Sequence, residues 1–130
     1  MSRSKNVLVI GDTHFPFCHP KYLDFCYEVA NKFQCSEFVH IGDEVDNHAI
    51  SFHEHNPNGE SASKEAIMAM QQLNIWYKRF PNVKVCIGNH SALHKRKALA
   101  NGLPERFIKS YEDAWEAPRG WKWSLEWEID

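Results

Sequence analysis

Three stretches decide the fold: "VIGD" at residues 9–12, "HIGD" at 40–43 and "CIGN" at 86–89. Each closes a short apolar run with isoleucine, then glycine, then an aspartate or an asparagine. Such runs, rich in β-branched residues, are typical of strands in a parallel sheet, so we expect strands at 6–10, 37–41 and 82–87, the first buried on both faces. Glycine allows a sharp turn at a strand end because it has no Cβ to clash. The repeat therefore predicts strands whose carboxyl ends share one edge of a sheet.

The segments between these strands have the periodicity of amphipathic helices. Residues 19–33 place Tyr22, Cys26 and Ala30 at helical spacing, and residues 61–80 form a second helix with Ser61 or Ser63 as N-cap. Shorter helices are expected at 91–100 and 105–116, whereas 44–60 is a long loop with room for one helical turn, and loops of that length are usually functional. The predicted fold class is α/β, with a mostly parallel sheet flanked by helices and right-handed crossovers.

The last segment, "WKWSLEWEI" at 121–129, has a different pattern. Tryptophans at 121, 123 and 127 alternate strictly with polar residues. This pattern is typical of a strand with one packed face and one wet face. We expect it to be an antiparallel edge strand or part of a second layer.

Length and composition limit the function. A chain of 130 residues with 43% apolar and 25% charged residues fits one globular domain, residues 1–130. The net charge of −2 gives no general attraction to nucleic acid or membrane. The four cysteines form no C-x-x-C pair, which favours reduced thiols, and with no signal peptide or membrane-spanning run we expect a cytoplasmic protein.

The strand endings also predict a metal site. Asp12, Asp43 and Asn89 should converge at the carboxyl edge of the sheet and bring His14, Asp46 and His90 with them. Oxygen and imidazole ligands suit Mn, Fe(II) or Zn better than a soft metal. The alternative, three unrelated capped turns, would have to repeat by coincidence on three successive strands.

The motifs "GDTH", "GDEVD" and "GNH", in this order, resemble the first three motifs of the calcineurin-like metallophosphoesterases, particularly small bacterial and bacteriophage members. The resemblance implies an αββα sandwich, of which this chain would form the N-terminal half. It also implies a divalent-metal-dependent phosphoesterase that hydrolyses phosphate esters by metal-activated water. Phosphodiesters, nucleic acid or nucleotides are the favoured substrates.

The resemblance also implies roles for individual residues and two metal ions per site, Mn first, with Fe, Zn or Ni as alternatives. Asp12 and His14 would hold the first ion, Asp43 would bridge both, and Asn89 would bind the second. His90 would protonate the leaving oxygen or steady the phosphoryl oxygens, and Asp46 would orient it. A carboxylate can bridge two cations, and the pair can stabilise both the attacking and the leaving oxygen.

Two departures from the family pattern affect these expectations. Ser91 follows "GNH" where the family usually has an acid, and no histidine follows His94, so the later histidine and the G-H-x-H motif are missing. The second metal would then be bound weakly or not at all. A chain truncated in this way would leave the face of Trp121, Trp123 and Trp127 uncovered, which favours self-association. The alternative function is a weakly active or inactive remnant that acts as a binding module.

Substrate contacts are expected from two further segments. His53 and His55 lie in the long loop, and Lys95 and Arg96 follow "GNH" in a basic helix that would begin at the metal site. The alternatives are solvated loop histidines and an ordinary charged helix surface. No aromatic residue alternates with these charges, so the sequence does not indicate a stacking platform.

Overall fold

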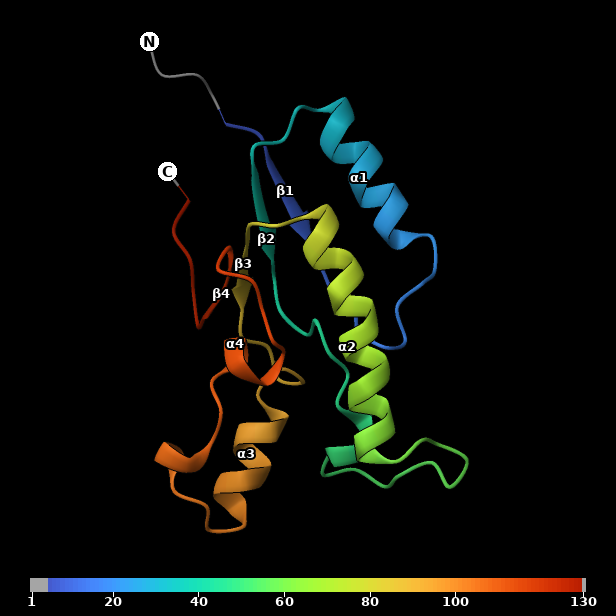
Figure 1. Ribbon diagram of the computed structural model, residues 1–130, viewed down its shortest axis with the longest axis vertical. Coiled ribbons are helices and arrows are strands. Elements are labelled where there is room, and N and C mark those ends of the chain that lie inside the picture. Colours follow the sequence, from blue (N-terminus) through green and yellow to red (C-terminus); the bar gives the residue numbers. More distant parts are fainter. Residues whose placement is uncertain (1–4, 130) are drawn as a thin grey trace.

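The computed structural model describes residues 5–129, which form a four-stranded parallel sheet with helices packed against it (Figure 1). The strands lie in sequence order and are β1 (Val7–Ile10), β2 (Glu37–His40), β3 (Val83–Cys86) and β4 (Trp121–Ser124). The helices are α1 (Tyr22–Lys32), α2 (Ala62–Arg79), α3 (Leu93–Ala100) and α4 (Tyr111–Ala114), with 3₁₀ turns η1 (His48–Ile50) and η2 (Glu105–Phe107). The predicted α/β class with a parallel sheet is confirmed.

All crossovers step in the same direction across the sheet. Right-handed connections in that arrangement place the helices on one face, and Figure 1 shows α1 and α2 on the same side of the strands. Ile10, on the covered face, is 1% exposed, whereas Val9 on the other face is 59% exposed. The expectation that the first strand is buried on both faces is therefore wrong, because β1 is an edge strand and α1 and α2 cover only one of its faces.

The closing strand is also different from both expectations. β4 pairs parallel to β3, with Val83 opposite Trp121 and Val85 opposite Trp123. Its alternation reflects an edge strand with one face in the core, and the segment before it is long enough for a parallel crossover. Trp121 and Trp123 are 1% and 8% exposed, whereas Trp127 lies beyond the end of β4 and is half-buried. Two of the three tryptophans expected on an uncovered face therefore lie inside the chain. Self-association remains a prediction, without that surface to support it.

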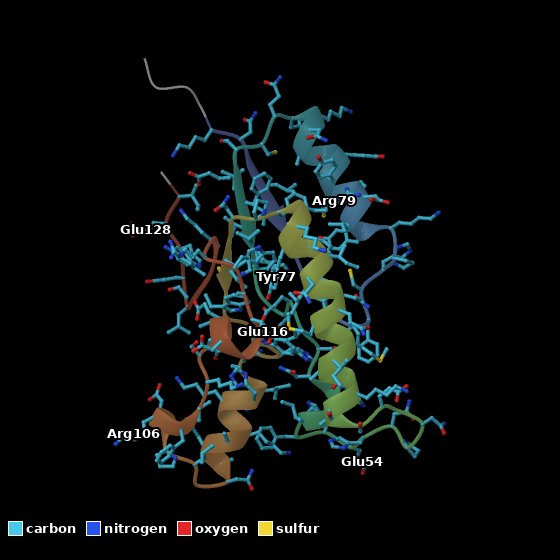
Figure 2. The ribbon with its side chains drawn as sticks, viewed as in Figure 1. Glu54, Tyr77, Arg79, Arg106, Glu116 and Glu128 are labelled. Carbon is cyan, nitrogen blue, oxygen red and sulfur yellow. The ribbon has the colours of Figure 1, made fainter. Side chains whose placement is uncertain are left out.

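The helices follow the sequence pattern where one face packs on the sheet. Ser61 caps α2 by accepting the Lys64 N–H, and Tyr77 lies between α2 and the sheet, where its hydroxyl donates to the Trp115 carbonyl at 2.8 Å (Figure 2). The segment expected to form one helix over 105–116 instead forms η2 and α4, because Ser110 starts a new helix by capping the Asp113 N–H. Leu99 on α3 is exposed.

Two remaining expectations concern the cysteines and the long loop. All four cysteines are free thiols. The loop at 44–60 contains the single helical turn η1. Across residues 5–129, no helix has both the length and the apolar character needed to cross a membrane.

Candidate metal centre and adjoining pocket

The endings of β1 and β2 converge as predicted. Beyond β1 and β2 the chain continues pairing, with the His14 N–H donating to the Asp43 carbonyl at 3.0 Å. This pairing brings ligand atoms of Asp12, His14 and Asp43 within 4.8 Å of one another. A second group within the same distance limit contains His14, Asp46 and His90. The two groups share His14, so they form one cluster at the carboxyl edge of the sheet.

The backbone around this cluster is strained. Asp12, His14, Asp43 and Asn47 have φ between 45° and 55°, and they are four of the six non-glycine residues with positive φ in residues 5–129. Asp, Asn and His tolerate this left-handed region better than most residues, yet it still has an energetic cost. Because strained residues cluster where function requires a fixed geometry, this concentration supports a functional site.

Gly88 makes room for the Asp43 carboxylate. A Cβ at position 88 would lie 2.3 Å from Asp43 Oδ1 and 2.7 Å from the Asp43 backbone nitrogen. Any side chain at this position would therefore displace Asp43. The glycine of "IGN" is required by this contact between neighbouring strand ends, in addition to the turn it allows.

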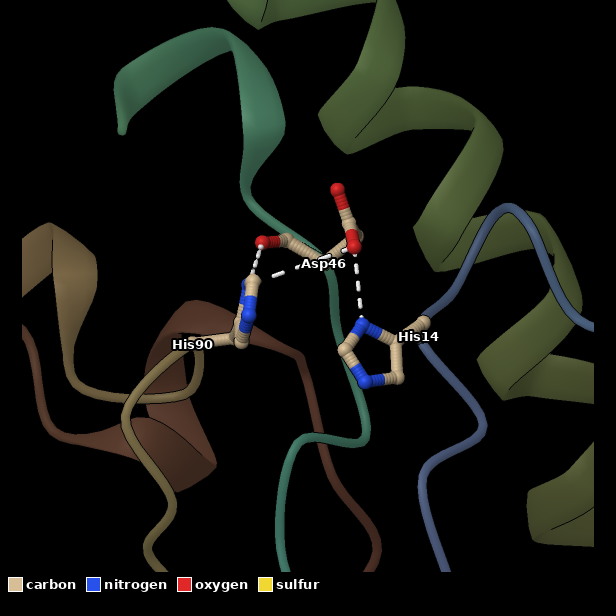
Figure 3. A group of neighbouring side chains, drawn as sticks. All are labelled: His14, Asp46 and His90. Atoms are coloured by element: carbon tan, nitrogen blue, oxygen red, sulfur yellow. Dashed lines mark hydrogen bonds and ion pairs between the residues drawn. The ribbon is translucent and has the colours of Figure 1, made fainter. Parts of the chain in front are cut away.

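His14 is oriented by Asp46 (Figure 3). Its Nδ1 lies 2.8 Å from Asp46 Oδ1, so Nδ1 carries the proton and donates it to the carboxylate. The other ring nitrogen, Nε2, keeps its lone pair and lies 3.6 Å from Asp12 Oδ1. A histidine held by a carboxylate through one nitrogen, with the other nitrogen free, is the usual arrangement of a metal-binding imidazole.

His90 is oriented mainly by the main chain. Its Nδ1 lies 2.7 Å from the Asp46 carbonyl oxygen and 3.9 Å from the Asp46 carboxylate. The motif resemblance predicts that Asp46 orients His90. In the structure the Asp46 carboxylate instead contacts His14, and its backbone carbonyl holds His90 (Figure 3). His90 Nδ1 therefore donates, and its Nε2 is available to solvent or substrate.

The donor set fits a divalent cation. Three carboxylates, those of Asp12, Asp43 and Asp46, gather around two imidazoles whose ring centres are 4.7 Å apart. The Asp43 carboxylate has one charge-stabilising partner in the His90 N–H, at 2.8 Å. Like charges this close repel one another unless a cation lies among them. Oxygen and imidazole donors in this arrangement suit Mn, Fe, Zn or a similar ion.

A buried carboxyl group, that of Glu44, is connected to the site by hydrogen bonds through Ser91. Glu44 is 0% exposed; its Oε2 accepts from Ser91 Oγ at 2.7 Å and its Oε1 accepts from Trp123 Nε1 at 3.2 Å. Ser91 Oγ in turn accepts the Asp43 and Gly88 N–H groups at 3.2 Å. Burial raises the pKa of the Glu44 carboxyl above its ordinary value, although its hydrogen bonds oppose this. Sequence reasoning missed Glu44, because nothing local shows that its side chain turns inward.

His40, the last residue of β2, is a structural residue. Its Nδ1 accepts the Gly42 N–H, so its Nε2 carries the proton and donates to Thr13 Oγ1 at 3.0 Å. Thr13 donates in turn to the Glu44 carbonyl. Burial lowers the pKa of His40 to about 4, so the ring is neutral near pH 7. This chain of hydrogen bonds fixes the loop after β1 against the loop after β2.

A pocket of about 250 Å³ opens beside the cluster. Asn89 and His90 line it together with Phe52, His53 and Arg96. The sequence analysis assigned Asn89 to the second metal and His53 and Arg96 to the substrate. The structure brings all three to one pocket next to His90.

Phe52 is a pocket residue that sequence reasoning missed. Its ring is 53% exposed, and the Arg96 guanidinium and the Lys97 ammonium lie 5.4 and 4.5 Å from its centre. The sequence indicated no aromatic platform because Phe52 lies far from the basic segment along the chain. Only the folded loop brings the ring and the cations together.

Lys95 and His55 were also assigned to the substrate, and neither lines this pocket. Lys95 is paired with Glu105 at 2.6 Å. His55 packs against His48, with ring centres 6.0 Å apart. The basic helix therefore presents one face to the pocket and another to η2.

A scan against protein-family models and searches of curated proteins and of solved structures find no match to this chain.

Proposed function

We propose that this chain binds divalent metal ions at the sheet edge and hydrolyses phosphate esters there, with phosphodiesters or nucleotides as the favoured substrates. The observation that carries the proposal is the convergence of Asp12, His14 and Asp43 at the ends of two adjacent parallel strands, with ligand atoms within 4.8 Å. The motif resemblance to calcineurin-like metallophosphoesterases agrees with this geometry. The sheet face without described helices is where that family's second sheet would pack.

The proposed roles combine the contacts within the cluster with the motif resemblance, which alone assigns Asn89. Asp12, His14 and Asp43 would hold the first ion, and Asp43 with Asn89 would hold the second. Bound ions would supply Lewis acidity and a water molecule of lowered pKa. Asp46 keeps the proton on His14 Nδ1, so that Nε2 remains a ligand.

The remaining residues would act on the substrate. His90 donates from Nδ1 to the Asp46 carbonyl, so a proton on Nε2 makes the ring a general acid that can protonate the leaving oxygen. Arg96, in the same pocket, can bind phosphoryl oxygens with a bidentate pair of hydrogen bonds. The exposed Phe52 ring offers a surface for a base or another flat group of the substrate.

The direct test is hydrolysis of a chromogenic bis-ester and a chromogenic mono-ester with added Mn²⁺, comparing the wild type with Asp43→Asn. We expect activity in the wild type and its loss, by at least about 100-fold, in the variant, since a neutral amide bridges cations poorly. Equal activity in the two proteins would refute the assignment of Asp43. Asp24→Asn, on the exposed surface of α1, is the matched control.

A second candidate function is a non-catalytic binding module. The observation that favours it is the sparse ligand set of the second ion, to which the resemblance assigns only Asp43 and Asn89. Metal analysis after Mn²⁺ loading separates the two candidates: about two ions per chain support the enzyme. One tightly bound ion without turnover supports the binding module, and no bound ion contradicts both.

A further inference from the structure

His90 is held at three points by residues of the loop after β2. Its N–H donates to Asp43 Oδ1 at 2.8 Å, and its ring Nδ1 donates to the Asp46 carbonyl at 2.7 Å. Its own carbonyl oxygen accepts from the Asn47 side chain at 2.8 Å. The place of the ring, and the direction in which Nε2 points, therefore depend on where Asp46 and Asn47 lie (Figure 3).

Asn47 begins the 3₁₀ turn η1 without capping it. It is the N-cap residue of η1 and has a φ of 53°, in the left-handed region. An asparagine at an N-cap ordinarily accepts a main-chain N–H of the turn that it starts. The Asn47 side chain makes no such bond within η1 and donates to His90 instead. The first N–H groups of η1 therefore need an acceptor from another part of the chain.

Glu65, in the first turn of α2, supplies that acceptor. η1 lies against α2 (Figure 1). One carboxylate oxygen of Glu65 accepts the His48 N–H at 3.1 Å, and the other accepts the Ala49 N–H at 2.9 Å. Glu65 is 6% exposed, and burial of a carboxylate is unfavourable unless hydrogen bonds satisfy it. Because both oxygens bind the main chain of η1, Glu65 fixes the turn that directly follows Asn47.

We propose that Glu65 is a positioning residue for His90. Its carboxylate holds η1 and thereby Asn47, and Asn47 together with the Asp46 carbonyl holds His90. This inference rests on the proposed function, in which His90 protonates the leaving oxygen. Glu65 does not line the pocket beside His90, so its effect passes through these hydrogen bonds. Misplacing a catalytic group by about 1 Å can lower a rate about 100-fold, so the loss of this connection should be measurable.

The first test follows the His90 ring in the metal-free protein. Glu65→Gln preserves the size of the side chain, but an amide offers one acceptor oxygen where the carboxylate offers two. With ¹⁵N-labelled histidine, in EDTA and at about pH 8, where an ordinary histidine is neutral, the wild type should carry the His90 proton on Nδ1. We expect Glu65→Gln to move the His90 signals toward the Nε2-protonated form, while the buried His40 keeps its signals. Glu60→Gln removes an exposed carboxylate nearby in the sequence and should change neither histidine.

The second test uses the basicity of the leaving group. A general acid contributes most when the leaving oxygen is basic, so a phenyl diester depends on it more than a 4-nitrophenyl diester, whose leaving group is the stronger acid. In the Mn²⁺-loaded protein, Glu65→Gln should lower kcat for the phenyl diester by at least about tenfold and for the 4-nitrophenyl diester by no more than about twofold. A merely structural defect would lower both rates equally.

Asn47→Gly tests the same connection at its other end. It removes the bond to the His90 carbonyl and keeps the positive φ, which glycine adopts freely. It should shift the His90 signals as Glu65→Gln does, and the double variant should show little further change, because both residues act through one connection. Unchanged His90 signals in a folded Glu65→Gln or Asn47→Gly protein, or an equal fall of kcat for the two esters, would overturn the proposal. If the wild type hydrolyses neither ester, the proposed function fails, whereas the metal-free spectra still decide whether Glu65 positions His90.

Discussion

Replacing Gly88 with alanine tests whether the strand endings form a metal site. The new Cβ would lie 2.3 Å from Asp43 Oδ1, and an ordinary contact begins near 3.4 Å, so the carboxylate must retreat by about 1 Å. Disturbing the support of a metal ligand typically costs 10-fold to 100-fold in affinity, or about 1.4 to 2.7 kcal/mol. We therefore expect Gly88→Ala to weaken Mn²⁺ binding by this amount, measured by isothermal titration calorimetry.

Gly11→Ala is the matched control, since Gly11 occupies the corresponding position of "IGD" at the end of β1. There the new Cβ would meet Ile41 Cδ1 at 3.1 Å, the movable end of an exposed side chain. We expect Mn²⁺ affinity within about twofold of wild type, as for a small rearrangement of packing. If both variants bind Mn²⁺ as the wild type does, and thermal unfolding shows both folded, Asp43 is not a ligand and the reasoning fails.

Four further predictions concern residues at or near the site. Protonation of His40, whose pKa burial lowers from 6.5 to about 4, favours the unfolded state. The free energy of unfolding should therefore fall by up to about 3 kcal/mol between pH 6.5 and 4 in urea titrations, and a flat profile in a Glu44→Gln background would contradict the lowered pKa of His40. Glu44 has the opposite effect on the pH dependence of stability. Because burial raises its pKa in the folded state, its contribution to stability is lost as pH rises through that folded-state pKa, and Glu44→Gln should remove this loss. Asp46→Asn should weaken Mn²⁺ binding 10-fold to 100-fold, while Asp24→Asn should leave the affinity unchanged in the same titration. Phe52→Ala should weaken binding of adenosine monophosphate at least about fivefold, and Phe25→Ala, an equally exposed ring on α1, should not; equal effects of the two would exclude stacking on Phe52.

The sequence predicted the parts of the fold that depend on local pattern. The three Ile-Gly-Asp/Asn endings located β1, β2 and β3 and brought Asp12, Asp43 and Asn89 toward one edge, since strand period and turn chemistry are encoded locally. Pairing partners are not encoded in this way. The alternation of residues 121–129 is the same for an antiparallel edge strand and a parallel one. The direction becomes clear only from the pairing with β3, where Trp121 lies opposite Val83 and Trp123 opposite Val85.

The same limit applies within the site. Residue types predicted a cluster of carboxylates and imidazoles, and the cluster exists. The direction of each hydrogen bond could not be predicted, so Asp46 was assigned to His90 although its carboxylate holds His14. The role of Phe52 could not be predicted for a related reason: its cationic neighbours belong to α3, which is distant in sequence.

Ser91 shows how an off-pattern residue can preserve a site. The resembling family usually has an acid after "GNH", and serine at that position suggested a weakened match. In the fold, the Ser91 hydroxyl accepts hydrogen bonds from the N–H groups of Asp43 and Gly88 and donates one to the buried Glu44 carboxyl. A carboxyl group is therefore still present next to this turn. It belongs to Glu44, in the loop after β2, and it is connected to the turn by the Ser91 hydroxyl. Because these bonds position the backbone of Asp43, the substitution is compatible with a metal-binding geometry, and Glu44 is the residue on which that geometry depends.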